Sequence, residues 1–367
     1  MTNSRTWTAR VPPTSPPHRG EPLDVLVVGA GQAGLALAWH LNGTRARYLV
    51  VDSAPEVGHS WRRRWDSLRL FTPSQYDGLP GAPFPGPTDS HPSKDQVADY
   101  LRAYAESNAF PILTGTEVER LLPTADGFQA ITSQGVLRAR QVVVATGPFQ
   151  RPHVPAITAM FDPDLPQIHS ADYRNPDELS GDTVLVVGGG NSGLQIADEL
   201  NRSRRVILAI GTQPPVLPQR IAGRDVFFWL TRFGLIDKPA DSPLARRVRA
   251  RGDLVIGDGP RQLRRRGLDV RARVVRCEGR VASFADGTTA AVDAVVWATG
   301  FRSDYSWIDA PIADAHGQPL QQEGRSPVPG LWFLGRPWQR SRGSALLGFV
   351  QHDAALIAGQ IQRRTLH

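Results

Sequence analysis

Two glycine-rich stretches constrain the fold of this chain more than any other feature of its sequence. In the first, an apolar run over 23–28 leads into a G-x-G-x-x-G motif at 29–34, the spacing of a strand–turn–helix unit that binds a dinucleotide. The first glycine permits a tight turn, the second lets the backbone approach a pyrophosphate, and the third lets the helix expected over 32–42 pack on the strand. The next apolar run ends in Asp52, where this fold places a carboxylate on a ribose hydroxyl.

The second stretch repeats this plan. An apolar run over 183–187 leads into a G-x-G-x-x-G motif at 188–193 and a helix to about residue 201. Two such units predict an α/β fold with two Rossmann-like dinucleotide-binding domains. Counting from the motif places the counterpart of Asp52 at Gly211, which carries no carboxylate. An acid there would repel a 2′-phosphate, so its absence favours NADPH over NADH.

The residue that binds this 2′-phosphate is left open by the sequence. Thr212 follows Gly211 directly and is one candidate contact, while Arg220 and Arg224 are the candidate cations. The alternative for both arginines is a solvated loop.

An aromatic and cationic segment follows Asp52. Trp61 can stack on a planar ring, and Arg62 can offset negative charge on a reduced flavin, so these residues suggest the wall of a flavin pocket. The alternative is a surface loop with a buried tryptophan. A further apolar segment at 225–236 predicts a buried helix that packs as core, with a cover over the substrate cavity or a partner interface as alternatives.

The remaining patterns indicate a duplicated architecture. Short strands near 118–139 precede an Ala-Thr-Gly sequence at 145–147, and strands over 273–284 precede a second one at 298–300. A short strand near 329–335 and a helix that opens at 342–348 and runs to about residue 362 are expected to return to the first unit. The predicted division is a disordered leader at 1–21, an FAD-binding domain at 22–150 and 296–362, and an inserted NADP-binding domain at 151–295.

Composition excludes several classes of function. The net charge is +7, but the arginines are dispersed and no nucleic-acid motif is present, so no nucleic-acid partner is expected. The one cysteine, Cys277, excludes an internal disulfide and a C-x-x-C redox pair. The sequence shows no apolar run long enough to span a membrane and no signal peptide, which favours a cytoplasmic protein. The histidines lack metal-ligand spacing, so no metal is expected.

The order of motifs resembles the flavin-containing monooxygenase superfamily, that is, the class B flavoprotein monooxygenases, in the compact bacterial branch near the YUCCA-type enzymes. The motifs that carry this resemblance are GAGQAG at 29–34, GHSW at 58–61, LRLFTP at 68–73, VVVATGPF at 142–149, HSADYRNP at 169–176, GGGNSG at 188–193 and VVWATGF at 295–301.

The resemblance implies a function. FAD binds the first unit and NADPH the second, NADPH reduces the flavin, and O2 adds at the flavin 4a carbon. The resulting peroxyflavin inserts one oxygen atom into a small organic substrate at nitrogen, sulfur or a carbonyl carbon. The expected partners are this substrate and O2, and a homodimer is left open.

The resemblance and the motifs together give the candidate site residues. The catalytic candidates are Trp61, Thr72, Gln75 and His169. The cofactor-binding candidates of the first unit are Gly29, Gly31, Gln32, Ala33, Gly34, Asp52, Ser53, Trp61, Arg62, Thr146, Gly147, Gly335 and Leu347. Those of the second unit are Gly188, Gly190, Asn191, Ser192, Gly193, Thr212, Arg220, Ala298, Thr299 and Gly300.

Two departures from the family pattern keep a second function open. The family fingerprint F-x-G-x-x-x-H ends at His169, but Pro163 and Leu165 replace its Phe and Gly. Many relatives also place an asparagine beside the flavin, whereas 68–75 contains none, so Thr72, Ser74 or Gln75 must provide the polar contact. The alternatives are an NADPH oxidase or reductase that makes hydrogen peroxide or passes electrons on, and a non-enzymatic redox sensor.

Overall fold

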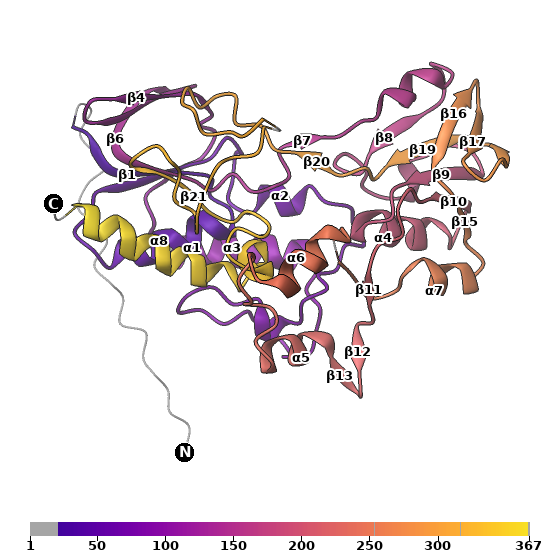
Figure 1. Cartoon of the computed structure of the whole chain (residues 1–367), viewed down its shortest axis with the longest axis horizontal. Coiled ribbons are helices and arrows are strands. Elements are labelled where there is room, and N and C mark those ends of the chain that lie inside the picture. Colours follow the sequence, from indigo (N-terminus) through magenta and orange to yellow (C-terminus); the bar gives the residue numbers. More distant parts are fainter. Residues whose placement is uncertain (1–20, 253, 316, 366–367) are drawn as a thin grey trace.

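A computed structural model describes residues 21–252, 254–315 and 317–365 of the chain. The predicted disordered leader, residues 1–21, lies outside these residues except for Glu21. The described chain forms two sheet-centred units that lie side by side (Figure 1). This arrangement confirms the predicted α/β fold with two Rossmann-like units.

The first unit is built on a sheet in the order β3-β2-β1-β6-β5-β4, with β21 beside β6. Its strands are β1 (Leu23–Val28), β2 (Tyr48–Val51), β3 (Ile112–Leu113), β4 (Val118–Thr124), β5 (Gly127–Thr132), β6 (Gly135–Val144) and β21 (Leu331–Phe333). The strands β3, β2, β1, β6 and β21 are parallel, and β4 and β5 extend the sheet as an antiparallel meander. Because β21 follows the second unit in sequence, the first unit is discontinuous.

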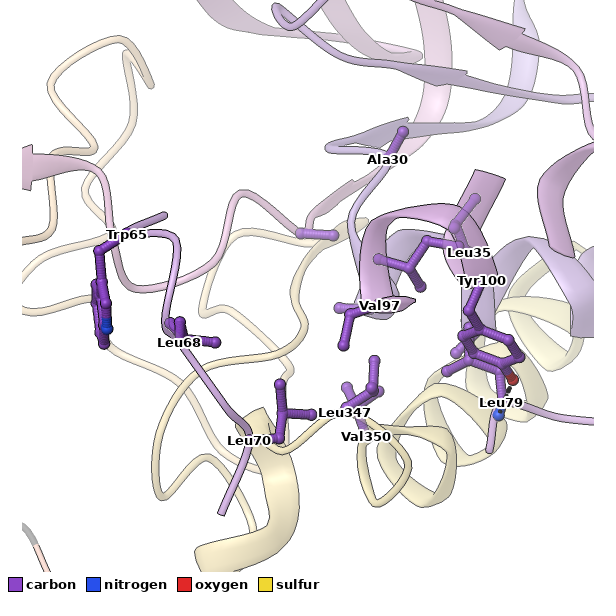
Figure 2. Close-up of a cluster of buried hydrophobic side chains, with 14 of the residues drawn as sticks. Ala30, Leu35, Trp65, Leu68, Leu70, Leu79, Val97, Tyr100, Leu347 and Val350 are labelled. Carbon is purple, nitrogen blue, oxygen red and sulfur yellow. Dashed lines mark hydrogen bonds between the residues drawn. The ribbon is translucent and has the colours of Figure 1, made fainter. Parts of the chain in front are cut away.

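Helices and loops cover this sheet with an apolar layer. The helices are α1 (Gln32–Asn42), α3 (Lys94–Ser107) and α8 (Val350–Thr365), with a short α2 (His59–Arg62). Figure 2 shows the cluster in which Leu35 of α1, Val97 of α3 and Val350 of α8 meet Leu70 and Leu347 from loops. The segment that follows Asp52 packs into this layer through Leu68 and Leu70.

The start of the last helix differs from the prediction. A 3₁₀ turn over Arg342–Ala345 comes first, and α8 begins only at Val350. A Cβ on Gly348 would lie 2.1 Å from the carbonyl oxygen of Tyr76, so the chain there is pressed against the loop that contains Tyr76. This packing, which the local pattern does not contain, delays the helix.

The second unit has a five-stranded parallel sheet in the order β15-β10-β9-β19-β8. Its strands are β8 (Gln167–His169), β9 (Thr183–Val187), β10 (Arg205–Ala209), β15 (Asp269–Arg271) and β19 (Ala294–Trp297), and its helices are α4 (Asn191–Leu200) and α7 (Pro260–Arg265). An antiparallel meander of β16 (Val274–Glu278), β17 (Val281–Phe284) and β18 (Thr289–Ala291) precedes β19. The boundary placed between residues 295 and 296 is therefore wrong in position, because it cuts through β19.

The two units are joined by an antiparallel pair of short strands, β7 (Arg151–Pro152) and β20 (Phe301–Arg302) (Figure 1). β20 follows directly after the Ala-Thr-Gly segment at 298–300, and β7 is separated by three residues from the one at 145–147. The ends of those segments are thereby held at the junction of the units.

A largely extended excursion leaves the second unit between β10 and β15. It contains β11 (Val216–Leu217), β12 (Arg220–Ile221), β13 (Arg224–Asp225), α5 (Val226–Arg232), α6 (Pro243–Ala250) and β14 (Val255–Ile256). The buried helix predicted over 225–236 is only partly correct. Val226 and Phe227 are buried, but Phe233 is 62% exposed, because α5 ends at Arg232 and the chain then turns outward. No helix in the described ranges is both long and apolar enough to cross a membrane.

Candidate active site

The two glycine turns have the same geometry. Gly29 and Gly188 both have positive φ, +114° and +132°, and a Cβ on them would lie 2.5 Å from the Ala145 carbonyl oxygen and 2.2 Å from that of Ala298. A Cβ on Gly34 or on its counterpart in α4 would collide with the carbonyl oxygen of the first glycine of its turn. Only glycine fits these positions, so both turns pack tightly against the Ala-Thr-Gly segments.

The middle glycine of each turn faces open space instead. A Cβ on Gly31 or Gly190 would meet no atom within 4 Å. The backbone amides at the starts of α1 and α4 lie beside this space, and those amides have no partner within their helix. Each turn therefore offers donors and room to a pyrophosphate.

Asp52 lies against the first turn as predicted. One carboxylate oxygen accepts from the backbone N–H of Ala30 at 2.6 Å and the other from that of Ala54 at 2.8 Å. The neighbouring Ser53 is exposed. The carboxylate keeps lone pairs free for a ribose hydroxyl.

The carboxy-terminal segment completes the first unit. A Cβ on Gly335 would lie 2.7 Å from the Cβ of Ala33 at the start of α1. Leu347 is buried beside Leu70 in the cluster of Figure 2. The chain thus returns to the first glycine turn after building the second unit.

The predicted flavin wall is only partly arranged as expected. The Trp61 indole N–H donates to the side-chain oxygen of Gln32 at 3.4 Å, so these two candidates are adjacent. Arg62, in contrast, bonds Asp99 at 2.7 Å and lies 3.6 Å from Asp95. Because α3 supplies these carboxylates, the charge of Arg62 is already balanced, which removes the reason given for assigning it to the flavin.

Arg64, which is not among the residues predicted from the sequence, lies where the two units meet. Its guanidinium is 4.7 Å from the ring centroid of Phe149 and 5.5 Å from that of Phe301, and the two rings are 5.2 Å apart. Burial, and secondarily the charge of Arg174, lowers the pKa of Arg64. No carboxylate of the described residues forms an ion pair with Arg64, so a half-buried cation remains unbalanced between the loops that follow Gly147 and Gly300.

His169 is fixed by backbone bonds on both sides of its ring. Nδ1 accepts from the N–H of Ala171 at 3.0 Å, which leaves the proton on Nε2 to donate to the carbonyl oxygen of Gly300 at 3.1 Å. Burial lowers the pKa of His169, in keeping with this neutral form. The ring therefore holds the linker against the second Ala-Thr-Gly segment, which is the backbone-bonded alternative to a catalytic role.

Thr72 and Gln75 lie in different surroundings. The Thr72 hydroxyl donates to the buried carboxyl group of Asp77 at 2.5 Å, and the second oxygen of Asp77 has no partner. Burial raises the pKa of Asp77 to about 7. Gln75 is exposed and lines a cavity of about 400 Å³ together with Tyr76 and Gly348.

The polar residues around the second turn are held by the protein itself. The Asn191 side chain donates to the carbonyl oxygen of Leu254 at 3.2 Å and accepts from the N–H of Ile256 at 3.2 Å. The Thr299 hydroxyl donates to the carbonyl oxygen of His153. In the first unit the Thr146 hydroxyl oxygen accepts from Gln150. These residues shape the two turns, and Ser192 and Ala298 line the second one half-exposed.

The counterpart of Asp52 lies one residue before the predicted Gly211. The N–H of Gly29 donates to Val51, the residue before Asp52, and the N–H of Gly188 donates to Ala209. The counterpart is therefore Ile210, which is buried and uncharged. Ile210 carries no carboxylate, so the prediction of no acid at this position is unchanged. The position differs because the connection from the glycine turn to the end of the next strand is one residue shorter in the second unit.

The three residues predicted as 2′-phosphate contacts, Thr212, Arg220 and Arg224, do not lie together beside Ile210. Arg220 forms an ion pair with Asp89 of the first unit at 2.8 Å, and Arg224 lies 4.5 Å from the ring of Phe228. Thr212 is exposed beyond β10. Across the described ranges, no group of His, Cys, Asp and Glu side chains is arranged to hold a metal ion.

Comparisons with known proteins agree with this architecture. Residues 26–218 match the family model described as pyridine nucleotide-disulphide oxidoreductase. The chain is 41% identical over 341 residues to an uncharacterized CzcO-like oxidoreductase of Geobacillus kaustophilus, covering 92% of this chain and 98% of the relative. It is 29% identical to the indole-3-pyruvate monooxygenase YUCCA1 of rice, over 89% of this chain and 86% of that protein.

A solved structure resembles the whole chain. The flavin-containing monooxygenase from Stenotrophomonas maltophilia matches with a TM-score of 0.79 and 29% identity, over 94% of this chain and 99% of that one. The chain has one cysteine, Cys277, and therefore no C-x-x-C redox pair. The chain is an oxidoreductase of the pyridine nucleotide-disulphide oxidoreductase family and a member of the flavin-containing monooxygenase superfamily.

Proposed function

We propose that the protein is an NADPH- and O2-dependent FAD monooxygenase that transfers one oxygen atom to nitrogen, sulfur or a carbonyl carbon of a small organic substrate. The meeting of the two Ala-Thr-Gly segments around Arg64 carries this proposal, because Phe149 and Phe301 from the two units contact each other there. Two dinucleotides bound to the two turns would approach the same junction. Location in the cytoplasm and a homodimer stay predictions.

The residues of both units fit the cofactors. In the first unit, the open space at Gly31 accommodates a pyrophosphate, and Asp52 is fixed beside the turn to accept from the adenosine ribose of FAD. In the second, the space at Gly190 does the same for NADPH, while Ile210 removes the carboxylate that a 2′-phosphate would oppose. When bound, NADPH supplies a hydride, and FAD passes the electrons to O2 and delivers one oxygen atom.

The protein contributes position and exclusion of water rather than an oxidant. His169 holds the Gly300 carbonyl, and Arg64 packs on the rings of Phe149 and Phe301, so a cation and two aromatic rings line the junction. A half-buried guanidinium without an ion-pair partner favours anionic groups placed beside it. These residues are expected to orient the reacting parts and to keep solvent away from them.

The test combines spectroscopy with product analysis. The purified protein should carry FAD, and NADPH consumption should accelerate with a substrate drawn from amines, sulfides, ketones and 2-oxo acids, including indole-3-pyruvate. Under ¹⁸O2 the product should gain one labelled oxygen atom, with the other leaving as water. A protein that binds no flavin after reconstitution, or a product oxygen taken from water, would overturn the proposal.

An NADPH oxidase is the second candidate, and the surroundings of Thr72 favour it. Its hydroxyl is already donated to Asp77, so the segment that carries an asparagine in many relatives has one polar group fewer to offer. Leu165, where the fingerprint has glycine, is packed in the core of the second unit. An oxidase would form one hydrogen peroxide per NADPH with every substrate tested, whereas a monooxygenase would form little peroxide once its substrate is present.

A further inference from the structure

The strand ladders of the two units can be matched residue by residue beyond their glycine turns. In the first sheet Val51 of β2 is paired with Leu113 of β3, and in the second Ala209 of β10 is paired with Arg271 of β15. The bond that follows each pair is also the same. The next residue of β2 donates to the Leu113 carbonyl oxygen at 3.0 Å, and the next residue of β10 donates to that of Arg271 at 3.1 Å.

This register assigns two pairs of equivalent positions at the ribose end of each sheet. Asp52 in the first unit corresponds to Ile210 in the second. Two residues after the ladder pair, Gly115 in the first unit corresponds to Arg273 in the second. The two units therefore carry opposite charges at this end of their sheets. The first unit has the acid Asp52 and no charge at Gly115. The second unit has the uncharged Ile210 and a cation at Arg273.

The Arg273 side chain reaches across the end of β10. A Cβ added to Gly211 would lie 2.9 Å from its Nε and 3.1 Å from one Nη atom, so the guanidinium rests on the Gly211 backbone. Any side chain at 211 would have to displace it. Glycine at this position thus allows a cation to occupy the place where the chain leaves the strand.

Arg273 is not committed to another charge. No carboxylate of the described residues forms an ion pair with it, and its side chain is exposed. The neighbouring Arg271 is bonded to Asp269 and packs 5.0 Å from the ring of Phe284. The acid nearest in the adjoining turn, Asp286, accepts from Thr288. Arg273 alone among these cations is available to an anion.

We propose that Arg273 binds the 2′-phosphate of NADPH and so sets the preference for NADPH over NADH. This inference rests on the proposed nicotinamide-nucleotide site of the second unit. A guanidinium can donate two parallel hydrogen bonds to a phosphate, and the exchanged acid leaves nothing to repel it. The first unit, with Asp52 and Gly115, is arranged for the unphosphorylated ribose of FAD. Arg273 thus takes the role that the sequence offered to Arg220.

The experiment measures nucleotide binding directly. The probe is adenosine 2′,5′-bisphosphate, titrated calorimetrically into the FAD-loaded enzyme, with adenosine 5′-monophosphate as the matched ligand without the 2′-phosphate. The Arg273→Ala variant should bind the bisphosphate at least tenfold more weakly and the monophosphate unchanged. The control Arg220→Ala, which breaks the pair with Asp89, should leave both affinities within about twofold. The KM ratio of NADPH to NADH should rise only in Arg273→Ala.

The outcomes separate this inference from the function on which it rests. If wild type binds the bisphosphate more tightly than the monophosphate, and Arg273→Ala does so equally, the role of Arg273 is overturned. The NADPH site itself is then kept. Equal affinity of wild type for both probes overturns it as well, since no 2′-phosphate is then recognised. Binding of neither probe to wild type removes the nicotinamide-nucleotide site itself.

Discussion

At the residue scale, Asp77 is a buried titratable group bonded to the candidate residue Thr72. Its carboxyl group is fully buried, accepts one bond from Thr72 and leaves one oxygen without a partner. Burial raises the pKa of Asp77 to about 7, against the opposing effects of Thr72 and of His91. Since the folded pKa exceeds that of the unfolded chain, the neutral carboxyl stabilises the fold at low pH, and this stability is lost as the pH rises toward and through 7.

The Asp77→Asn variant should remove this pH dependence. Asparagine still accepts from Thr72 and carries no charge, so between pH 5 and pH 8 its free energy of unfolding should gain roughly 2 to 3 kcal/mol relative to wild type. Urea unfolding at both pH values measures this difference. Repeating the pair in a His91→Gln background controls for the effect of the neighbouring His91 side chain on Asp77. A constant difference across the pH range would show that Asp77 is ionised throughout.

Gly188 and Gly190 of the second turn should respond differently to replacement by alanine. Gly188→Ala forces a side chain into positive φ at 2.2 Å from the Ala298 carbonyl oxygen, so it should destabilise the fold by about 1 to 3 kcal/mol or more. Gly190→Ala meets no atom within 4 Å and should unfold like wild type. Its methyl group enters the space assigned to the pyrophosphate, so nucleotide affinity should fall at least about tenfold. Unchanged affinity in Gly190→Ala would place the nucleotide elsewhere.

At the element scale, the parts that could be predicted from the sequence are those with a local cause. The glycine turns were found because positive φ and close backbone contact demand glycine at fixed spacing, as at Gly29 and Gly188. Arg273 was missed because it meets Gly211 only through the pairing of β10 with a strand far along the chain. The same reason explains why the sequence pointed to Arg62 and not Arg64 at the flavin. Asp95 and Asp99 of α3, which pair with Arg62, lie more than 30 residues along the chain from it.

One element-scale contact has a direct test. Asn191 at the start of α4 holds the chain at 254–256 by two hydrogen bonds, and Ile256 is buried. The Asn191→Ala variant leaves these backbone groups without partners, so it should cost about 2 kcal/mol and speed amide hydrogen exchange at Ile256. The adjacent Ser192→Ala should do neither. Unaltered exchange in Asn191→Ala would mean that other contacts hold the segment.

At the scale of the whole molecule, one plan is used twice and then altered. Each unit joins a parallel sheet, a glycine turn and an antiparallel meander that leads to an Ala-Thr-Gly segment. The units differ where each sheet faces the expected ribose, since the first has the acid Asp52 and the second has the cation Arg273. They also differ at the junction, where the first unit contributes a cation, Arg64. Binding is thus specified within each unit, whereas transfer between the cofactors depends on the contact between units.

The Arg64→Met variant tests this separation. Methionine keeps an unbranched apolar chain between Phe149 and Phe301 but removes the charge, so FAD content and affinity for adenosine 2′,5′-bisphosphate should stay within about twofold of wild type. The rate at which NADPH bleaches the flavin should fall by about tenfold or more, because the two cofactors lose the group that aligns them. Arg63→Met is the matched control, since Arg63 is exposed and lies 3.9 Å from its partner Asp172. Bleaching at the wild-type rate in Arg64→Met would show that the junction aligns the cofactors without this cation, and loss of FAD would instead make Arg64 part of the first binding site.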